Sequence, residues 1–231
     1  MKRHTLNKSK PTIQLLNMDC MEYMATLPDK AFDLAIVDVP YGSSNINGGY
    51  TSGKGGTAGA AQQLTYNRAI WSFAAPEQQY FNELMRVSEN QIIWGANHLI
   101  SKIQIDSPCW IVWDKKNENT GFADCELAWG SFNKAVRKFE FMWNGMLQGD
   151  MKNKELRIHP TQKPVKLYEW LLTNYAKPGD RILDTHLGSM SSVIAANNLG
   201  FELTGCELDP DYFKAGCERA MQATAQERMF P

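Results

Sequence analysis

An acidic residue directly follows an apolar run in residues 31–42, AFDLAIVDVPYG, and its position indicates a ligand site. Residues 32–37 are apolar and β-branched enough to predict a buried strand. Open α/β sheets bind ligands beyond the carboxyl ends of their strands. The residues at that place are Asp38, Val39, Pro40 and Tyr41. We therefore predict a binding or catalytic role for this stretch. On these residues alone, a strand that ends in a Pro turn beside an isolated Asp is an equally good interpretation.

The same four residues, DVPY, resemble the D-P-P-Y signature of DNA amino-methyltransferases, which methylate the exocyclic amine of adenine. The resemblance implies that Asp38 and the Val39 carbonyl accept the amine N–H bonds and stabilise the positive charge that develops on the nitrogen. Pro40 fixes the backbone, and Tyr41 offers a face on which a flipped base stacks. Val39 replaces the first Pro of the signature, but a carbonyl contact is available to either residue.

A second block, from residue 158 to residue 211, resembles the cofactor half of the same family. It contains HPTQKP at residues 159–164, then a predicted helix over 165–177, a strand over 181–184, a turn of small residues and a helix that ends at Gly200. A strand, a turn and a helix N-terminus form a cradle for a cofactor. The resemblance implies S-adenosylmethionine, bound by Thr161, Lys163, Asp184, Gly188 and Ser189.

Two further acids support a nucleotide-like cofactor. Glu207 follows the predicted strand 201–206, about twenty residues after the turn, where an acid binds ribose hydroxyls in dinucleotide folds. Asp19 ends the predicted strand 12–18, and in the family an acid at this point binds the adenine amine of the cofactor, with Cys20 offering a backbone N–H. Asp19 as the N-cap of a short helix over 21–27 is an equally good local interpretation.

The cofactor turn departs from the family pattern D-P-F-x-G-S-G-T at Thr185, His186 and Met190. Met190 occupies the second glycine position, where bulk and a low tolerance of positive φ are expected to weaken cofactor binding. This departure motivates an alternative from another class, a non-catalytic DNA-binding relative. An NAD-type oxidoreductase is disfavoured, because G-x-G-x-x-G is absent and that class has no use for DVPY.

The order of the two motifs, with DVPY before HPTQKP, matches the permuted β group of these methyltransferases. The implied fold is α/β: a doubly wound, mostly parallel, seven-stranded sheet with helices on both faces, as in class I, Rossmann-like methyltransferases. We predict one domain over 1–231. Its parts are a catalytic half over 12–114, a small inserted target-recognition region over 115–157 and a cofactor half over 158–222.

The predicted function is S-adenosylmethionine-dependent methylation of adenine N6 in double-stranded DNA, in a restriction-modification context and with a possible homodimer. The N4-cytosine enzymes of the group generally carry Ser where Asp38 stands, so Asp38 favours adenine. N4-cytosine methylation is the leading alternative, and RNA methylation is less favoured. The recognised site and any partner nuclease are not evident in the sequence.

Composition limits where DNA can bind. The 24 Lys and Arg nearly balance the 25 Asp and Glu, so DNA contacts must come from a local patch. Residues 133–166 hold eight Lys and Arg against three acids, interleaved with aromatic residues. The predicted DNA-binding residues are Lys134, Arg137, Lys138, Lys152, Lys154 and Arg157. Such runs are also typical of ordinary solvated faces.

The remaining features are weaker. The basic tail of residues 1–11 is expected to be solvated and disordered, with a lesser chance of touching DNA. Residues 42–61 read as a loop that closes over the cofactor and base, and the P-loop-like GGYTSGKG at 48–55 is rejected because Gly55 stands where a hydroxyl would hold magnesium. The five Cys form no C-x-x-C pair, and no metal is expected. With no apolar membrane span and no signal peptide, a cytoplasmic location is predicted.

Overall fold

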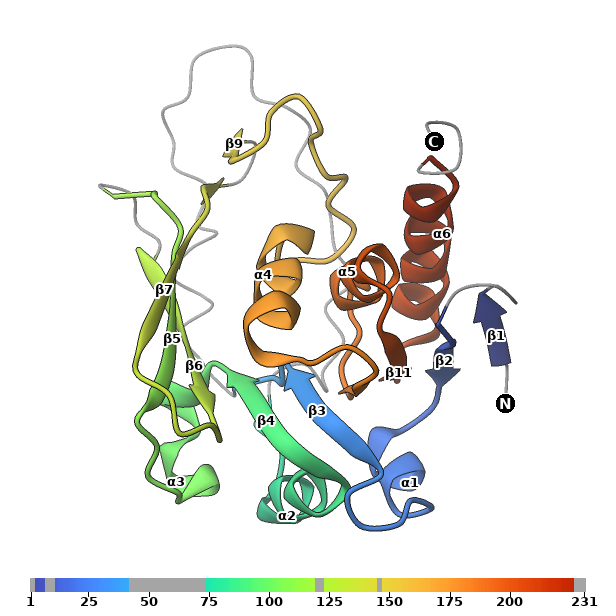
Figure 1. The fold of residues 1–231 in the computed structure, drawn as a ribbon. Helices are drawn as coiled ribbons and strands as arrows, with labels where there is room; N and C mark the ends of the chain where they lie inside the picture. Colours follow the sequence, from blue (N-terminus) through green and yellow to red (C-terminus); the bar gives the residue numbers. More distant parts are fainter. Residues whose placement is uncertain (1–2, 7–10, 42–73, 119–122, 145–146, 227–231) are drawn as a thin grey trace.

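The computed structural model describes residues 3–6, 11–41, 74–118, 123–144 and 147–226, and its centre is a nine-stranded sheet (Figure 1). The strand order is β1-β2-β11-β10-β3-β4-β6-β5-β7. These strands are β1 (Arg3–Leu6), β2 (Ile13–Asn17), β3 (Phe32–Val37), β4 (Ser88–Trp94), β5 (Cys109–Asp114), β6 (Cys125–Gly130), β7 (Arg137–Glu140), β10 (Arg181–Asp184) and β11 (Glu202–Glu207). A separate two-stranded sheet pairs β8 (Trp143–Asn144) with β9 (Leu147–Gln148).

The sheet is mostly parallel, as predicted, but it has nine strands and not seven. The central run from β2 through β11, β10 and β3 to β4 is parallel throughout. The pattern of apolar runs located β2, β3, β4, β5, β10 and β11 to within a few residues. It missed β1, β6 and β7, whose sequences mix polar and apolar residues and give no continuous apolar run.

Helices cover both faces of the sheet (Figure 1). The helices are α1 (Cys20–Met24), α2 (Gln78–Val87), α3 (Ile100–Ile103), α4 (Val165–Tyr175), α5 (Ser191–Leu199) and α6 (Pro210–Gln226), with a 3₁₀ turn, η3, at Ala96–His98. Because side chains alternate along a strand, Leu34 and Ile36 of β3 face the core under α4–α6, while Ala35 and Val37 face the core over α1–α3. Burial on both faces explains why β3 reads as a continuous apolar run.

The chain reverses its direction across the sheet between β3 and β10, and this places the two predicted motifs together. From β3 the chain passes through α2 to β4 on one side, and from β10 it passes through α5 to β11 on the other. Strands β3 and β10 are parallel neighbours, with Leu34 opposite Ile182. Ligands of open α/β sheets bind at such a switch point, beyond the carboxyl ends of the strands. Residues 38–41 and the turn after Asp184 both lie there.

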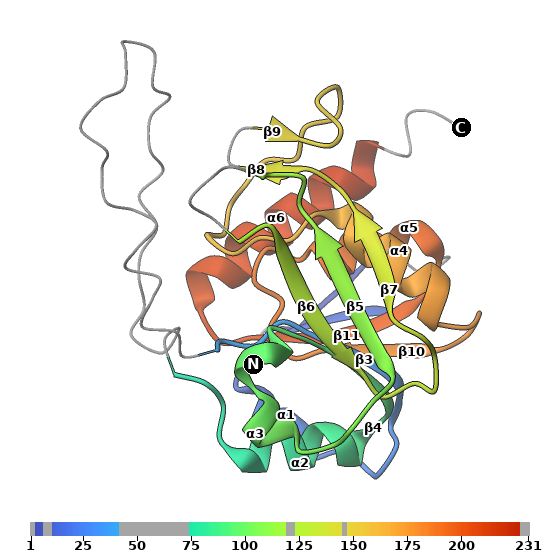
Figure 2. The same ribbon diagram turned by 90° about the vertical axis from the view of Figure 1, so that its left-hand side faces the viewer.

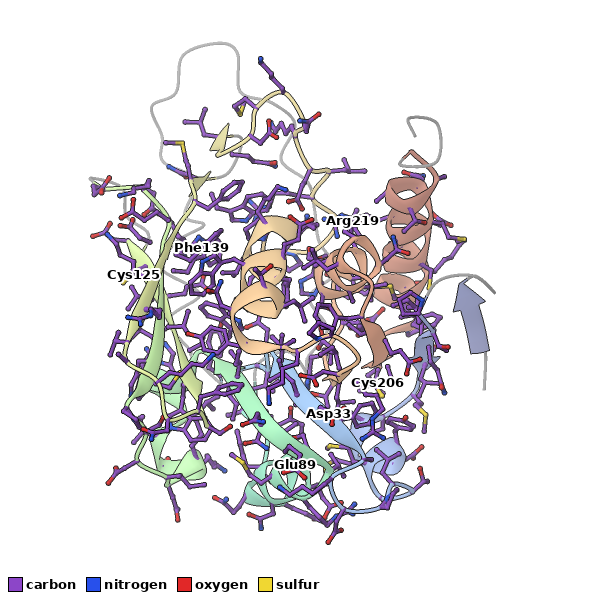
Figure 3. All side chains as sticks on the ribbon, viewed as in Figure 1. Asp33, Glu89, Cys125, Phe139, Cys206 and Arg219 are labelled. Atoms are coloured by element: carbon purple, nitrogen blue, oxygen red, sulfur yellow. The ribbon has the colours of Figure 1, made fainter. Side chains whose placement is uncertain are left out.

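Much of the predicted recognition region belongs to the main sheet. Strand β6 runs antiparallel between β4 and β5, and β7 pairs in parallel with β5, as Figure 2 shows. Phe139 of β7 points toward α4, where its ring lies 5.5 Å from that of Trp170 (Figure 3). Of the 115–157 stretch, residues 125–130 and 137–140 therefore belong to the main sheet, and residues 141–157 follow β7 along the chain. The division of the chain into functional halves stays a proposal.

Other expectations fall outside the described part or are corrected there. The basic tail was expected to be disordered, yet residues 3–6 pair with β2 as an antiparallel edge strand. The proposed closing loop over 42–61, with its P-loop-like segment, lies outside the described residues. No helix in the described ranges is long and apolar enough to cross a bilayer. In the same ranges, no group of three or more His, Cys, Asp or Glu is arranged to hold a metal ion.

Candidate active site

Asp38 stands one residue beyond β3, and a buried lysine from the other half of the chain binds it. Lys163 Nζ donates to Asp38 Oδ2 at 2.6 Å, across 125 positions of sequence. Among the described residues, the other carboxylate oxygen, Oδ1, accepts a single, long hydrogen bond of 3.3 Å from the Tyr41 hydroxyl. One oxygen of Asp38 is thus firmly held, and the other is weakly engaged.

A second carboxylate shares the same lysine. Glu126 of β6 lies 3.0 Å from Lys163 Nζ through Oε2 and 2.8 Å from Lys115 Nζ through Oε1. Burial alone would raise the pKa of Glu126, but the two lysines outweigh it and lower the pKa to about 2. Burial raises the pKa of Asp38, and Lys163 opposes this rise. Asp38 and Glu126 together keep the pKa of Lys163 well above its usual range although its side chain is only 2% exposed. We call residues 38–41 with Glu126 and Lys163 the catalytic corner.

Tyr41 is fitted into this corner by a glycine. A Cβ added at Gly95, directly after β4, would lie 2.1 Å from Cε1 of the Tyr41 ring, so only glycine leaves room for the ring there. His98 stacks on Tyr41, with ring centroids 5.3 Å apart and planes inclined by 15°. One face of the Tyr41 ring is therefore covered, which leaves at most the opposite face for a base. Val39 is buried in the core, and the predicted role of its carbonyl stays a proposal.

The predicted cofactor turn, residues 184–192, is organised by a second buried carboxylate. Asp184 ends β10 and accepts from the Ser192 hydroxyl at 2.5 Å and from the His186 backbone N–H at 3.0 Å. Burial raises the pKa of Asp184 to about 7, although both donors oppose the rise. Burial also lowers the pKa of His186 to about 4, so its ring is neutral at physiological pH. The ring contacts Tyr80 edge-on, as expected for a packing residue.

Two further predicted cofactor residues, Glu207 and Gly188, meet beyond the ends of the neighbouring strands β11 and β10. Glu207 ends β11 and accepts from the backbone N–H groups of Gly188, at 2.8 Å, and Asp209, at 3.0 Å. Gly188 has a φ of +48°, which residues with a Cβ rarely adopt, so the backbone conformation of the turn favours glycine there. An acid such as Glu207 suits the ribose hydroxyls of S-adenosylmethionine, and the turn at Gly188 suits its amino-acid part.

Asp19 follows β2, the neighbour of β11, and caps α1. Its carboxylate accepts from the Met21 N–H at 2.7 Å, so the alternative interpretation, a helix N-cap, is confirmed. A cap of this kind does not exclude a contact through the other oxygen, and the cofactor role stays a proposal. Burial raises the pKa of the Cys20 thiol to about 12, which makes its side chain inert and leaves its backbone N–H as the useful group.

Met190 adopts the conformation that the sequence argument assigned to glycine alone. Its φ is +59°, in the left-handed region, which costs roughly 1–2 kcal/mol for a residue with a Cβ. Its side chain has no exposed surface, and a Cβ added at Gly216 of α6 would lie 2.8 Å from Met190 Cγ. The side chain therefore fills the core beside α6. The position of the side chain gives no support to the expected obstruction of the cofactor site, and the effect of Met190 on cofactor binding stays a prediction.

HPTQKP links the two parts of the site. Its Lys163 carbonyl accepts from the Ser191 hydroxyl at 2.7 Å, while its Nζ reaches Asp38. Lys163 was predicted to bind the cofactor, and the structure places its ammonium in the catalytic corner. Thr161 is exposed and its hydroxyl lies 3.1 Å from His159 Nδ1, beside Gly188.

A buried arginine on α6 braces the cofactor turn. Arg219 donates to the Ser189 carbonyl at 2.6 Å and forms an ion pair of 2.6 Å with Glu155 (Figure 3). Ser189 itself is buried, and its hydroxyl lies 3.1 Å from that of Ser191. Glu155 is part of the 141–157 segment, so this contact ties that segment to the turn.

The predicted DNA-binding residues do not form one uniform basic patch. Lys134 donates to the Asn174 carbonyl at 2.7 Å and lies over the Tyr175 ring, and Lys138 pairs with Glu140. Arg137, Lys152 and Lys154 are exposed and Arg157 is half-buried. Within the described ranges, none of these four residues takes part in an ion pair. Two of the eight positive charges counted in residues 133–166, those of Lys163 and Lys166, are also paired.

Several residues of the site were missed or left without a role by the sequence argument. His98 and Gly95 fix the position of the Tyr41 ring, and Arg219 holds the cofactor turn through the Ser189 carbonyl. Glu126 lies in residues 122–129, whose two acids and an aromatic residue predict from the sequence that this stretch passes close to the active centre. In the structure, β6 brings Glu126 to 3.0 Å from Lys163 Nζ.

Comparisons with known proteins relate the whole chain to DNA methyltransferases. The model of a family described as DNA methylase matches residues 111–218. The type II methyltransferase M2.DpnII of Streptococcus pneumoniae is 24% identical over 249 residues, which cover 92% of this chain and 90% of that protein. M2.LlaDCHI of Lactococcus lactis subsp. cremoris is 29% identical over 151 residues, which cover 63% of this chain and 53% of that protein.

Solved structures with the same fold include several DNA methyltransferases. M1.HpyAVI in complex with S-adenosylmethionine aligns with a TM-score of 0.54 at 21% identity, covering 90% of this chain and 98% of that one. PvuII DNA methyltransferase, described as cytosine-N4-specific, aligns with a TM-score of 0.58 at 11% identity, covering 95% and 92%. At these identities the likeness shows the fold, and it confirms the predicted fold class. The family match and the two related type II enzymes likewise show that the chain is similar to DNA methyltransferases of the N6/N4 family, whose cofactor is S-adenosylmethionine.

Proposed function

We propose that this protein transfers a methyl group from S-adenosylmethionine to the exocyclic N6 of an adenine in double-stranded DNA. The observation that supports this most directly is the state of Asp38: a half-buried carboxylate beyond β3, next to the cofactor turn, with one oxygen fixed by Lys163 and the other weakly engaged. An exocyclic amine is a poor nucleophile because its lone pair is delocalised into the ring. A fixed acceptor favours a more tetrahedral nitrogen and stabilises the positive charge that develops on it.

The chain's own residues supply position and electrostatics. A target base must leave the duplex to reach this corner, and Tyr41 presents one ring face on which it stacks. Glu207, the turn at Gly188 and the end of β2 at Asp19 hold the cofactor. When bound, S-adenosylmethionine supplies an electrophilic methyl group: the amine nitrogen forms the new N–C bond, the methyl–sulfur pair returns to sulfur, and one amine proton is released. Because of its charge, Asp38 stabilises the ammonium that precedes this proton loss.

The base assignment rests on Asp38. The resemblance stated above associates Asp at this position with adenine enzymes and Ser with N4-cytosine enzymes. A cytosine amine presents similar hydrogens, so N4-cytosine methylation is the second candidate. The non-catalytic alternative has less support, because the Met190 side chain is buried beside α6.

The test is methyl transfer from labelled S-adenosylmethionine to unmethylated genomic DNA, followed by mass spectrometry of the nucleosides. We expect N6-methyladenine. N4-methylcytosine would keep the mechanism and overturn the base assignment, and the absence of product despite measured cofactor binding would overturn the proposal itself. Sedimentation of the same sample tests the predicted homodimer. The cytoplasmic location stays a prediction.

We further propose that residues 141–157 face the DNA. The exposed Lys152 and Lys154 lie in this segment together with exposed apolar side chains such as Leu156 and Met151. Each phosphate contact contributes roughly one to the salt slope of binding. Replacing both lysines by Ala should lower the slope of log K against log salt by about 2. Lys138→Ala is the matched control, because Glu140 already neutralises that lysine. Equal slopes for the double variant and the wild type would exclude these lysines as phosphate contacts.

A further inference from the structure

The Lys163 side chain is buried by contacts with residues that are far from it in the sequence. Its side chain is 2% exposed, its Nζ lies 2.6 Å from Asp38 and 3.0 Å from Glu126, and it stands over the Trp94 ring at 5.5 Å. Its backbone carbonyl is fixed by Ser191 at the start of α5. The ammonium thus connects the end of β3, strand β6 and the segment before α4.

The cluster continues outward through Lys115, which pairs with the far oxygen of Glu126 at 2.8 Å. The four charges alternate in sign from Asp38 to the surface, and they sum to zero. A buried ammonium with a single partner is costly, because removing ions from water costs several kcal/mol each. Two carboxylates on one lysine, with a second lysine behind, offset that cost and leave Lys163 little freedom to move.

The two carboxylate oxygens of Asp38 have different hydrogen-bond partners. Oδ2 is occupied by Lys163, whereas within the described part of the chain the one hydrogen bond to Oδ1 is the 3.3 Å contact from the Tyr41 hydroxyl. A carboxylate anchored through one oxygen cannot rotate freely, so Oδ1 keeps one direction. That oxygen is the one available to an incoming amine.

We propose that Lys163 and Glu126 are positioning residues for methyl transfer: Lys163 anchors Asp38 through Oδ2, Glu126 anchors Lys163, and Oδ1 is thereby presented to the target amine. This inference rests on the proposed function, since it assigns roles within the same reaction. It also removes Lys163 from the cofactor-binding set predicted from the sequence.

The two residues act on Asp38 with opposite sign, which makes the inference testable. The ammonium of Lys163 lowers the pKa of Asp38, and the carboxylate of Glu126 raises it. The other titratable groups that influence Asp38 or are influenced by it are Tyr41, Asp184 of β10 and Tyr168 of α4. None of these three is changed in the variants below. Amine binding needs the ionised Asp38, so the acid limb of the pH–rate profile should follow its titration.

The experiment is a single-turnover pH–rate profile for the wild type, Glu126→Gln and Lys163→Met on saturating DNA and S-adenosylmethionine. We expect the acid limb to move to lower pH in Glu126→Gln and to higher pH in Lys163→Met. We expect plateau rates to fall by about tenfold and about a hundredfold, as for lost transition-state contacts. KM for DNA should stay within about threefold, because neither residue is proposed to bind DNA. Lys166→Met is the control, since this exposed lysine pairs only with Glu169 and its profile should match the wild type.

A structural role alone would lower the rate at every pH without moving the limb, and that result overturns the inference. If Lys163→Met does not fold, the shift of the acid limb in Glu126→Gln tests the inference alone: a shift to lower pH supports it, and no shift or a shift to higher pH overturns it. Wild-type product analysis tests the proposed function separately. Should the wild type be inactive, the ¹³Cγ resonance of Asp38, assigned by its loss in Asp38→Asn, gives the titration midpoint directly. An unmoved midpoint in Glu126→Gln would then overturn the inference.

Discussion

The catalytic corner and the cofactor turn lie at the carboxyl ends of two neighbouring strands, and each is built around a buried aspartate. Asp38 is bound by an ammonium that comes from far along the chain. Asp184 is bound by a hydroxyl and a backbone N–H from its own turn. Burial raises the pKa of the first carboxylate, and the long-range charge of Lys163 opposes this rise. The second is surrounded by neutral donors, and burial raises its pKa to about 7.

The difference separates two tasks at one sheet edge. A group that stabilises a developing positive charge must itself be charged, so Asp38 needs a counter-ion to be ionised while buried. A group that shapes a loop needs hydrogen bonds more than charge, so Asp184 works with neutral partners. The charge of Asp38 raises the pKa of Asp184. Repulsion between the two carboxylates is smaller when only one of them is ionised.

Of the two aspartates, Asp38 and Asp184, replacing Asp38 should have the largest effect on methyl transfer. Asp38→Ala should lower methyl transfer by about 10²–10³ or more, because removing one preorganised partner of a transition state typically costs that much. Cofactor affinity, measured by isothermal titration, should stay within about threefold, which serves as the folding control. Transfer within about tenfold of the wild type would contradict the assigned role.

Asp184→Asn probes the neutral member through the pH dependence of stability. The pKa of Asp184 is about 7 in the folded protein against 3.8 when unfolded. The folded state therefore keeps a proton that the unfolded state releases, and stability falls as pH rises from about 4 to about 7. Asn does not titrate, so the variant should lack this fall, which is on the order of 2–4 kcal/mol.

Urea unfolding at several pH values without cofactor measures the difference between the two proteins. His186, whose pKa of about 4 adds stability as pH rises through the same range, is present in both and cancels. Parallel stability curves for the wild type and Asp184→Asn would mean that Asp184 is ionised in the fold.

Met190 tests whether the cofactor turn is strained without being obstructed. Met190→Ala should lower the free energy of unfolding by about 3 kcal/mol, because it empties a buried site. Met190→Gly should be about 1 kcal/mol less damaging, since glycine accepts the φ of +59° without strain. Both variants should bind S-adenosylmethionine within about threefold of the wild type. A tenfold tighter complex in Met190→Gly would restore the obstruction that the sequence suggested.

The same contrast explains what could be predicted from the sequence. Asp38, Asp184 and Glu207 are recognisable because each follows an apolar run that forms a buried strand, and strand ends meet at one edge of a parallel sheet. The hydrogen bonds that Asp184 accepts within the cofactor turn are also local, from residues two and eight positions away.

The catalytic corner depends on contacts that leave no local trace. Nothing in HPTQKP tells that Lys163 reaches Asp38, and nothing in β6 tells that Glu126 shares that lysine. The charge count over 133–166 overstates the unpaired positive charge for the same reason, because Lys138 and Lys163 are paired with carboxylates in the fold. The conformation of Met190 could not be predicted, because a residue-level rule for positive φ ignores the packing against α6 that compensates for the strain.

The smallest effect sharpens the comparison, because Ser192→Ala removes a neutral donor and leaves the aspartate. The Ser192 hydroxyl lowers the pKa of Asp184, so without it the carboxyl should titrate above about 7. A hydroxyl binds a carboxylate more strongly than a neutral carboxyl, so the loss of stability should be about 1 kcal/mol greater at pH 8 than at pH 5. Ser191→Ala is the matched control: this neighbouring buried hydroxyl donates to the Lys163 carbonyl, which does not titrate, and its cost should be the same at both pH values. Equal costs at both pH values for Ser192→Ala as well would mean that Asp184 keeps one protonation state across this range, and the two aspartates would then differ in position alone.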